Sequence, residues 1–179
     1  MSSRFEQTSS ETIHEGKFIT VERRTYRHED GGEVTREIVT HPGAVGVVVL
    51  DGDRLWLVRQ PREAVGSPDL LELPAGKLDE EGEGPLETAK RELAEEIGKG
   101  ARTWRHLTTF WSSPGFSDEE IHVYLATDLY DEHAEADANE RIEIETAPLS
   151  ELDRLIRDCK DSKSLVGLLW LRAYHLPPV

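Results

Sequence analysis

The most constraining feature of the chain is residues 76–98, where a glycine-containing loop leads into one short amphipathic helix. Pro85 suits the first helical turn because its missing N–H costs nothing there, and Gly98 is placed as the C-terminal stop. Between them, apolar side chains recur on one side of the helix predicted over 85–97. Any fold for this chain must therefore bury one face of that helix directly after the loop.

Three glutamates crowd one side of this helix. Glu92, Glu95 and Glu96 stand at positions i, i+3 and i+4, so they project from neighbouring places. Like charges at that spacing destabilise a helix unless Arg91 beside them or a divalent cation offsets them, and Mg²⁺ prefers oxygen ligands. The alternative is a solvated acidic face. The acids border the apolar face and follow a glycine loop, which favours a metal site.

The rest of the chain is predicted to build one mixed sheet between helices. Two β-like runs around Asp30-Gly31-Gly32 predict an N-terminal hairpin over 17–27 and 34–40. Further strands are predicted over 43–50, 54–60, 104–112, 121–127 and 141–145, exposed loops over 61–69 and 128–139, and helices over 148–158 and 162–175. We expect an α+β fold with two parts, an antiparallel β extension over 1–42 and the main domain over 43–179.

Composition limits the partners. The chain has 36 acidic and 21 basic residues, a formal net charge of −15, which repels nucleic acid and anionic membranes, so neither is an expected partner. A phosphate-bearing ligand would need bound cations or nearby arginine. Cys159 is the only cysteine, so no intrachain disulfide can form, and neither a signal peptide nor a membrane-spanning stretch is evident. A cytoplasmic protein is expected.

The glutamate helix and its loop resemble the Nudix box. The matching residues are Gly76, Glu83, Arg91, Glu92, Leu93, Glu95, Glu96 and Gly98. The chain departs from the family pattern twice, with six residues instead of five between Gly76 and Glu83 and with Lys99 at an apolar position. The extra residue falls in a loop, where insertions cost little. The resemblance implies a Nudix fold, an α/β/α sandwich with the box as loop, helix and loop.

The resemblance also implies a metal site. In similar Nudix enzymes the main-chain carbonyl before the box glycine and the first and last glutamates of the Arg-Glu-x-x-Glu-Glu run hold the metals. Carried over, the ligands are Ala75, Glu92 and Glu96, with Glu95 supporting them in metal binding and catalysis. Mg²⁺, with Mn²⁺ as a substitute, would neutralise a diphosphate and lower the pKa of a bound water.

The flanks of the box resemble ADP-ribose pyrophosphatases. Residues 114–119 read Pro-Gly-Phe-Ser-Asp-Glu, like a loop of that subfamily, and Gln60-Pro61-Arg62 is similar to its Gln-x-Arg strand end. Residues 71–76 and 36–45 also resemble its segments. The resemblance implies hydrolysis of ADP-ribose to AMP and ribose 5-phosphate.

Substrate contacts follow from the same resemblance. Arg62 is expected to clamp the diphosphate, because an arginine fork fits paired phosphate oxygens, although a surface arginine at a strand end is the alternative. Phe116 would form a wall of the ribose pocket, unless it is a core residue, and Ser117 is a further expected substrate contact. Arg36 and Glu37 would reach the substrate of a partner subunit, against the alternative of a solvated strand edge.

A general base is expected on the acidic segment before the last predicted strand. Glu140 is our choice, with Asp137 and Glu143 as rivals and an exposed acidic loop without function as the alternative.

Two other functions stay open. One is the same chemistry on another nucleotide sugar, a dinucleotide or an oxidised nucleotide. The other is a non-catalytic Nudix sensor for ADP-ribose, which the intact Glu92, Glu95 and Glu96 argue against. The N-terminal extension resembles a segment that forms intertwined homodimers, so we expect a homodimer.

Overall fold

The chain folds into two compact units. The computed structural model describes residues 4–132, 134 and 141–174. One unit combines Met1–Gly43 with Trp111–Glu120, and the other combines Ala44–Phe110 with Ile121–Val179. Each unit is described by itself below.

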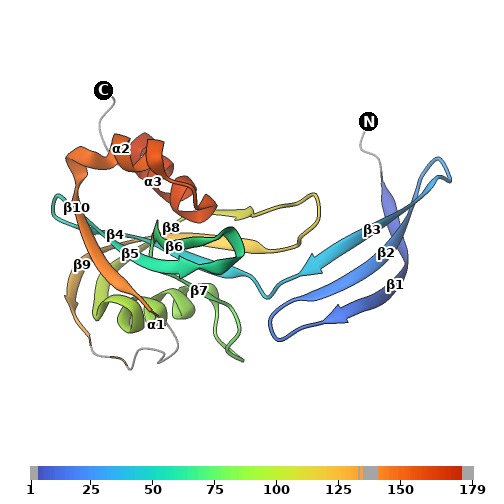
Figure 1. The fold of residues 1–179 in the computed structure, drawn as a ribbon, viewed down its shortest axis with the longest axis horizontal. Coiled ribbons are helices and arrows are strands. Elements are labelled where there is room, and N and C mark those ends of the chain that lie inside the picture. The colour runs from blue at the N-terminus through green and yellow to red at the C-terminus, as the bar shows by residue number, and fades with distance from the viewer. Residues whose placement is uncertain (1–3, 133, 135–140, 175–179) are drawn as a thin grey trace. The chain divides into compact units, whose positions relative to one another are not determined.

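The first unit is a three-stranded antiparallel sheet. Its strands β1 (Phe5–Glu15), β2 (Thr20–His28) and β3 (Glu33–Thr40) are hydrogen-bonded in that order (Figure 1). The predicted hairpin is confirmed as β2 and β3, and its turn uses Gly31 at a φ of 83°. The sequence did not reveal β1. All of its residues are exposed, so it lacks the apolar alternation that marks a half-buried strand.

A seven-stranded mixed sheet forms the centre of the second unit. Its strands are β4 (Ala44–Asp51), β5 (Arg54–Arg62), β6 (Ser67–Glu72), β7 (Ala75–Lys77), β8 (Lys99–Trp111), β9 (Glu120–Asp131) and β10 (Glu143–Pro148). The main order is β10-β5-β4-β9-β8, with β6 paired to β5 and β7 to β4. Strand β4 runs parallel to β9 and antiparallel to β5. Its continuous apolar run is buried because both faces of the sheet are covered.

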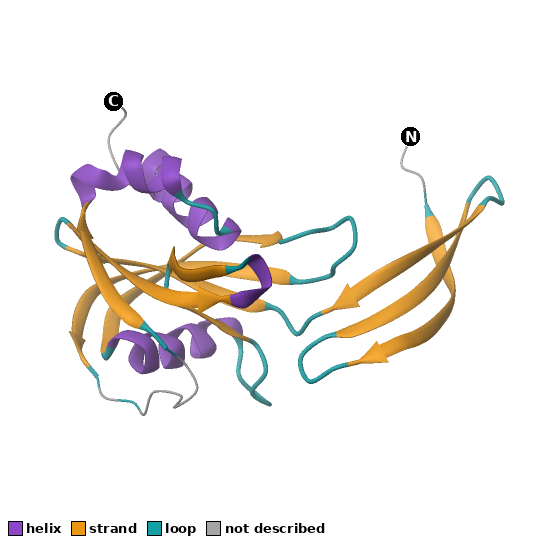
Figure 2. Ribbon diagram, in the orientation of Figure 1, coloured by secondary structure: helices purple, strands orange, loops and turns teal. Residues whose placement is uncertain are grey.

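Helices cover the two faces of this sheet. Helix α1 (Pro85–Ile97) lies on one face, and α2 (Leu152–Asp158) and α3 (Ser162–Tyr174) lie on the other (Figure 2). Two separate apolar clusters result: Ala89, Leu93 and Ile97 of α1 pack in one. Leu152, Leu155, Leu168 and Leu171 of the other two helices pack in the second. The predicted α+β class, with helices around a mixed sheet, is confirmed.

The predicted box helix has the observed bounds. Pro85 begins α1, and Gly98 ends it in the left-handed region at a φ of 65°, where its N–H donates to the Ala94 carbonyl at 3.0 Å. Among the described residues, no helix has the length and apolar character needed to cross a lipid bilayer.

Two predicted loops are wrong in part. Strand β5 continues to Arg62 and β6 begins at Ser67, so much of 61–69 is strand, joined by a short 3₁₀ turn at Glu63–Val65. The pairing of β5 with β6 overrides the local loop signal of Pro61, which falls at a register shift between Gln60 and Arg62. Likewise β9 extends to Asp131, into the predicted loop 128–139.

Candidate functional site

Gly76 lies directly against the first glutamate of the helix. A Cβ placed on Gly76 would stand 2.0 Å from both Cδ and Oε1 of Glu92. Glu92 is only 8% exposed although it carries a carboxylate. The glycine is therefore needed for space: its missing side chain is where the Glu92 carboxylate sits.

Glu96 is bound to the first residue of β7, the short strand that precedes the loop and the helix. Its Oε2 accepts a hydrogen bond from the main-chain N–H of Ala75 at 3.0 Å. Pro74, one residue earlier, is fixed to the central strand because its carbonyl accepts from the N–H of Val47 at 2.8 Å. Glu96 is 7% exposed. The main chain at 74–76 therefore lies directly against the carboxylates of Glu92 and Glu96.

Arg91 holds three carboxylates at once. Its Nη1 donates to Glu92 Oε1 and Glu95 Oε2, each at 2.9 Å, and its Nε donates to Glu83 at 3.1 Å. Burial by itself would lower the pKa of Arg91, but the surrounding carboxylates raise it above its ordinary value. Its Nη2 is buried without a hydrogen-bond partner among the described residues. One guanidinium therefore offsets the repulsion that the glutamate spacing creates.

These residues fit a hard divalent cation. The candidate ligands are carboxylate oxygens of Glu92, Glu95 and Glu96 and the main-chain carbonyl of Ala75, all oxygen atoms of the kind Mg²⁺ prefers. Among the described residues, no group of three or more Asp, Glu, His or Cys side chains forms a ready-made cage. That is compatible with a Mg²⁺ site completed by substrate phosphates and water.

Arg62 stands at the end of β5, next to a buried carboxylate. Its Nε and Nη2 donate to Glu72 Oε1 and Oε2 at 2.7 and 2.8 Å. The pKa of Arg62 is raised, chiefly by this hydrogen-bonded pair and further by the charges of Asp161 and Glu96. Arg62 therefore lies within the electrostatic reach of the glutamate helix, with its guanidinium oriented by Glu72.

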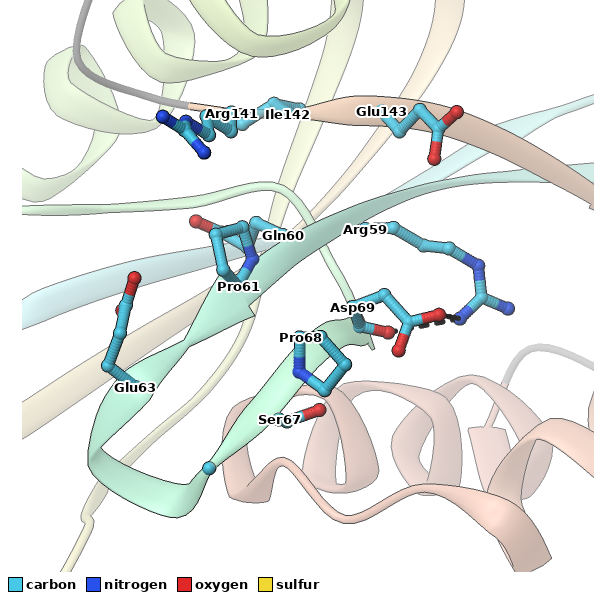
Figure 3. A pocket seen from close by; sticks show the side chains of 11 residues that line it. Arg59, Gln60, Pro61, Glu63, Ser67, Pro68, Asp69, Arg141, Ile142 and Glu143 are labelled. Carbon is cyan, nitrogen blue, oxygen red and sulfur yellow. Dashed lines mark hydrogen bonds and ion pairs between the residues drawn. The ribbon is translucent and has the colours of Figure 1, made fainter.

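A pocket of about 1000 Å³ opens beside β5 (Figure 3). Arg59, Gln60 and Glu63 line one side, and Arg141 and Glu143, the residues that follow 135–140 in the chain, line another. Gln60 Nε2 is buried and has no hydrogen-bond partner among the described residues. The volume is at the upper end of the range typical of small-molecule sites.

The other expected substrate contacts lie in the first unit. Arg36 and Glu37 are exposed on β3, where Arg36 donates to the Thr35 carbonyl and Glu37 pairs with Arg23 at 3.6 Å. The loop 113–119 joins β3, since Val39 donates to the Phe116 carbonyl at 2.8 Å. Phe116 is 56% exposed, so it is not a core residue within this unit.

The expected general base Glu140 and its rival Asp137 lie outside the described residues. The other rival, Glu143, is exposed at the start of β10 and lines the pocket. Thus the second unit brings Ala75, Glu92, Glu95 and Glu96 together, with Arg62 in reach of their charge.

Sequence reasoning missed a buried polar cluster behind Arg62. It contains Glu72, which is 1% exposed, and Lys163 and Ser164 at the start of α3. A charged residue between Leu71 and Leu73 in an apolar segment was the available signal, because acidic side chains are rarely buried unless paired. Lys163 lies 91 residues from Glu72, and Ser164 lies 91 residues from its partner Leu73, so no local pattern could identify these contacts.

Comparison with known proteins agrees with this geometry. The chain is 47% identical to the ADP-ribose pyrophosphatase of Mycobacterium tuberculosis over 140 residues, covering 74% of this chain and 67% of that protein. It is 38% identical to the ADP-ribose pyrophosphatase of Bacillus subtilis over 169 residues, covering 92% and 90%. A solved structure described as an ADP compounds hydrolase superposes with a TM-score of 0.84 at 25% identity, covering 96% of this chain and 94% of that one. The family model of the NUDIX domain matches residues 40–167, and the chain therefore belongs to the Nudix hydrolase family.

Proposed function

We propose that the protein hydrolyses the pyrophosphate bond of ADP-ribose, giving AMP and ribose 5-phosphate, and that the reaction depends on Mg²⁺. The observation that carries the reaction type is the placement of Glu92 and Glu96 against the main chain at Gly76 and Ala75. The substrate is supported by the two relatives that are ADP-ribose pyrophosphatases. Ala75, Glu92 and Glu96 would hold the cation, with Glu95 in support.

The residues of this chain have separate roles in that reaction. Bound Mg²⁺ would neutralise the diphosphate and make water more acidic. Arg62 would bind diphosphate oxygens through the part of its guanidinium that Glu72 leaves available. A water oxygen attacks one phosphorus as the P–O bond to the bridging oxygen breaks. The water proton passes to the general base, and the other phosphate leaves with the bridging oxygen.

The substrate is tested by a product profile. Purified protein with Mg²⁺ is incubated with ADP-ribose, a GDP-sugar, a dinucleoside polyphosphate and an oxidised nucleoside triphosphate, and the products are separated by chromatography. We expect ADP-ribose to have the highest kcat/KM and to yield AMP and ribose 5-phosphate in equal amounts. A higher kcat/KM for another compound would make that compound the substrate, and the proposed reaction type would still stand. Binding of ADP-ribose without turnover would support a sensor instead.

For the general base we propose Glu140, because it directly precedes the residues that line the pocket beside β5. Glu140→Gln should lower kcat and remove the acidic limb of its pH profile, since a deprotonated carboxylate is needed to accept the proton. Glu143→Gln is the matched comparison, and a larger loss there would transfer the role to Glu143. Asp137→Asn tests the third candidate in the same way.

We also propose that residues 1–42 are a dimerisation element and that the enzyme is a cytoplasmic homodimer. The first unit is a helix-free sheet within its described residues, and Phe5, Ile13, Phe18 and Ile19 are each at least 40% exposed there. Exposed apolar side chains on one small sheet suit a partner surface. Sedimentation or light scattering should give twice the mass of the chain, and a monomer at micromolar concentration would contradict this.

A further inference from the structure

An ion-pair cluster around the buried Glu72 carboxylate links the start of α3 to Arg62. The Glu72 cluster consists of Arg62, Glu72, Asp161 and Lys163. Lys163 Nζ binds Glu72 Oε2 and also Asp161 Oδ1, the latter at 3.0 Å. Lys163 is only 9% exposed, and its stem packs on Gly46 of the central strand, where a Cβ would meet the Lys163 Cβ at 3.7 Å. Lysine is rarely buried to this extent unless it is paired, so its position is specified by these partners.

The Glu72 cluster determines which edge of the Arg62 guanidinium is left exposed. A guanidinium has five N–H donors, and Glu72 takes one from Nε and one from Nη2. Within the described residues no hydrogen bond engages the edge formed by Nη1 and the second Nη2 hydrogen, so this edge can bind another anion. Arg62 also lines a cavity of about 690 Å³, and its side chain is 41% exposed. Glu72 therefore holds the Nε and Nη2 edge of the Arg62 guanidinium and leaves the other edge toward solvent.

Lys163 also balances the charge of this arrangement. The Glu72 cluster holds two cations and two carboxylates, so it is neutral as a whole. Without Lys163 the cluster as a whole, Arg62 included, would carry one net negative charge. That charge would weaken the attraction of Arg62 for a diphosphate.

The same helix start also holds the segment that enters the box. Ser164 Oγ accepts from the Leu73 N–H at 2.8 Å. Asp161 caps the helix, since its Oδ2 accepts from the N–H of Ser164 at 2.9 Å and from its hydroxyl. Leu73 stands two residues before Ala75, whose carbonyl is a proposed metal ligand. The start of α3 is thus connected to Arg62 through Lys163 and to the metal-site loop through Ser164.

We propose that Lys163 is a positioning residue for diphosphate hydrolysis, which acts through Glu72 to hold Arg62 against the substrate. This inference rests on the proposed function, in which Arg62 binds the diphosphate. Lys163 itself does not contact the substrate.

A double-mutant cycle tests this role. We would measure kcat and KM for ADP-ribose with the wild type, Lys163→Met, Arg62→Ala and the double variant. Lys163→Met should lower kcat/KM about tenfold, mainly through KM, because a displaced binding group loses ground-state contacts. In the Arg62→Ala background the same change should cost less than about twofold, since the group it positions is gone. Arg157→Met, which removes an exposed cation on α2, should resemble the wild type.

Fold-changes that multiply in the double variant would overturn the proposal, because they would show that Lys163 acts independently of Arg62. Wild-type kinetics of Lys163→Met would also overturn it. Glu72→Gln serves as a second variant if Lys163→Met does not fold, with the same expectation. Unfolding of both variants, seen by circular dichroism, would count against the proposal because the cluster would then serve the fold.

Failure of the proposed function can be distinguished from failure of the positioning role of Lys163. If the wild type prefers another nucleoside diphosphate derivative, the cycle is repeated on that compound, which shares the diphosphate. If the wild type hydrolyses none, the proposed activity is wrong, and the cycle is run on the Kd for ADP-ribose by calorimetry. A weaker Kd for Lys163→Met that disappears in the Arg62→Ala background would still support positioning, and additive losses would overturn it.

Discussion

Replacing Gly76 with alanine should damage catalysis far more than stability. The new methyl carbon would stand 2.0 Å from Cδ and Oε1 of Glu92 and 2.4 Å from its Cγ. Carbon atoms in contact are normally about 3.5–4.0 Å apart, so a displacement of roughly 1.5 Å is needed. All three atoms belong to one flexible side chain, and Glu92 can therefore rotate away while the backbone stays in place.

The consequence for the site is large because Glu92 is a proposed metal ligand. A displacement of about 1 Å in a catalytic arrangement can cost about a hundredfold in rate, so we expect a loss of that order in kcat. Overpacking typically costs about 1–3 kcal/mol, which for a chain of this size lowers Tm by only several degrees.

The assay is AMP release from ADP-ribose at several Mg²⁺ concentrations, together with a thermal unfolding curve. Gly46→Ala on the adjacent strand is the matched control, because its added Cβ would meet Lys163 only at an ordinary 3.7 Å. Gly76→Ala with the kcat of the wild type would refute the reasoning, since the position of Glu92 would then not matter. Loss of folding would refute the claim that the clash is local to one side chain.

Two further predictions concern pKa values. Burial opposes ionisation of Glu72, but Arg62 and Lys163 hold its pKa below the ordinary 4.5. The ionised Glu72 carboxylate therefore stabilises the fold above pH 4.5, and this stabilisation is lost as the pH falls through the lower pKa that Glu72 has in the folded state. Glu72→Gln should flatten this part of an acid-unfolding curve. An unchanged slope would contradict the assignment. Burial raises the pKa of the Cys159 thiol, so iodoacetamide should alkylate it more slowly at neutral pH than it does in urea, as followed by mass spectrometry, and equal rates would contradict this.

Local signals explain what the sequence predicted well. The box helix was predicted with its observed bounds because Pro85 and Gly98 act within one turn of their own positions. The central strand β4 was predicted from an uninterrupted apolar run. In both cases the residues that determine the structure lie inside the segment itself.

Long-range pairing explains what was missed. Strand β1 has no buried face and is defined by its hydrogen bonds to β2. Arg62 was predicted as a phosphate clamp, but its partner Glu72 was not identified from the sequence. Lys163 was assigned only to a terminal helix, since its contact with Glu72 spans 91 residues. Such contacts depend on sheet order, which a single sequence does not supply.

The central claim is that metal-dependent hydrolysis of ADP-ribose depends on the carboxylates of α1. The most direct measurement is the initial rate of AMP release with and without Mg²⁺ for the wild type, Glu96→Gln and Glu87→Gln. Glu87 is the matched control because it is exposed on the same helix. We predict Mg²⁺-dependent turnover for the wild type and Glu87→Gln, and a rate at least about a hundredfold lower for Glu96→Gln. Equal rates for Glu96→Gln and the wild type, or no turnover by the wild type, would contradict the claim.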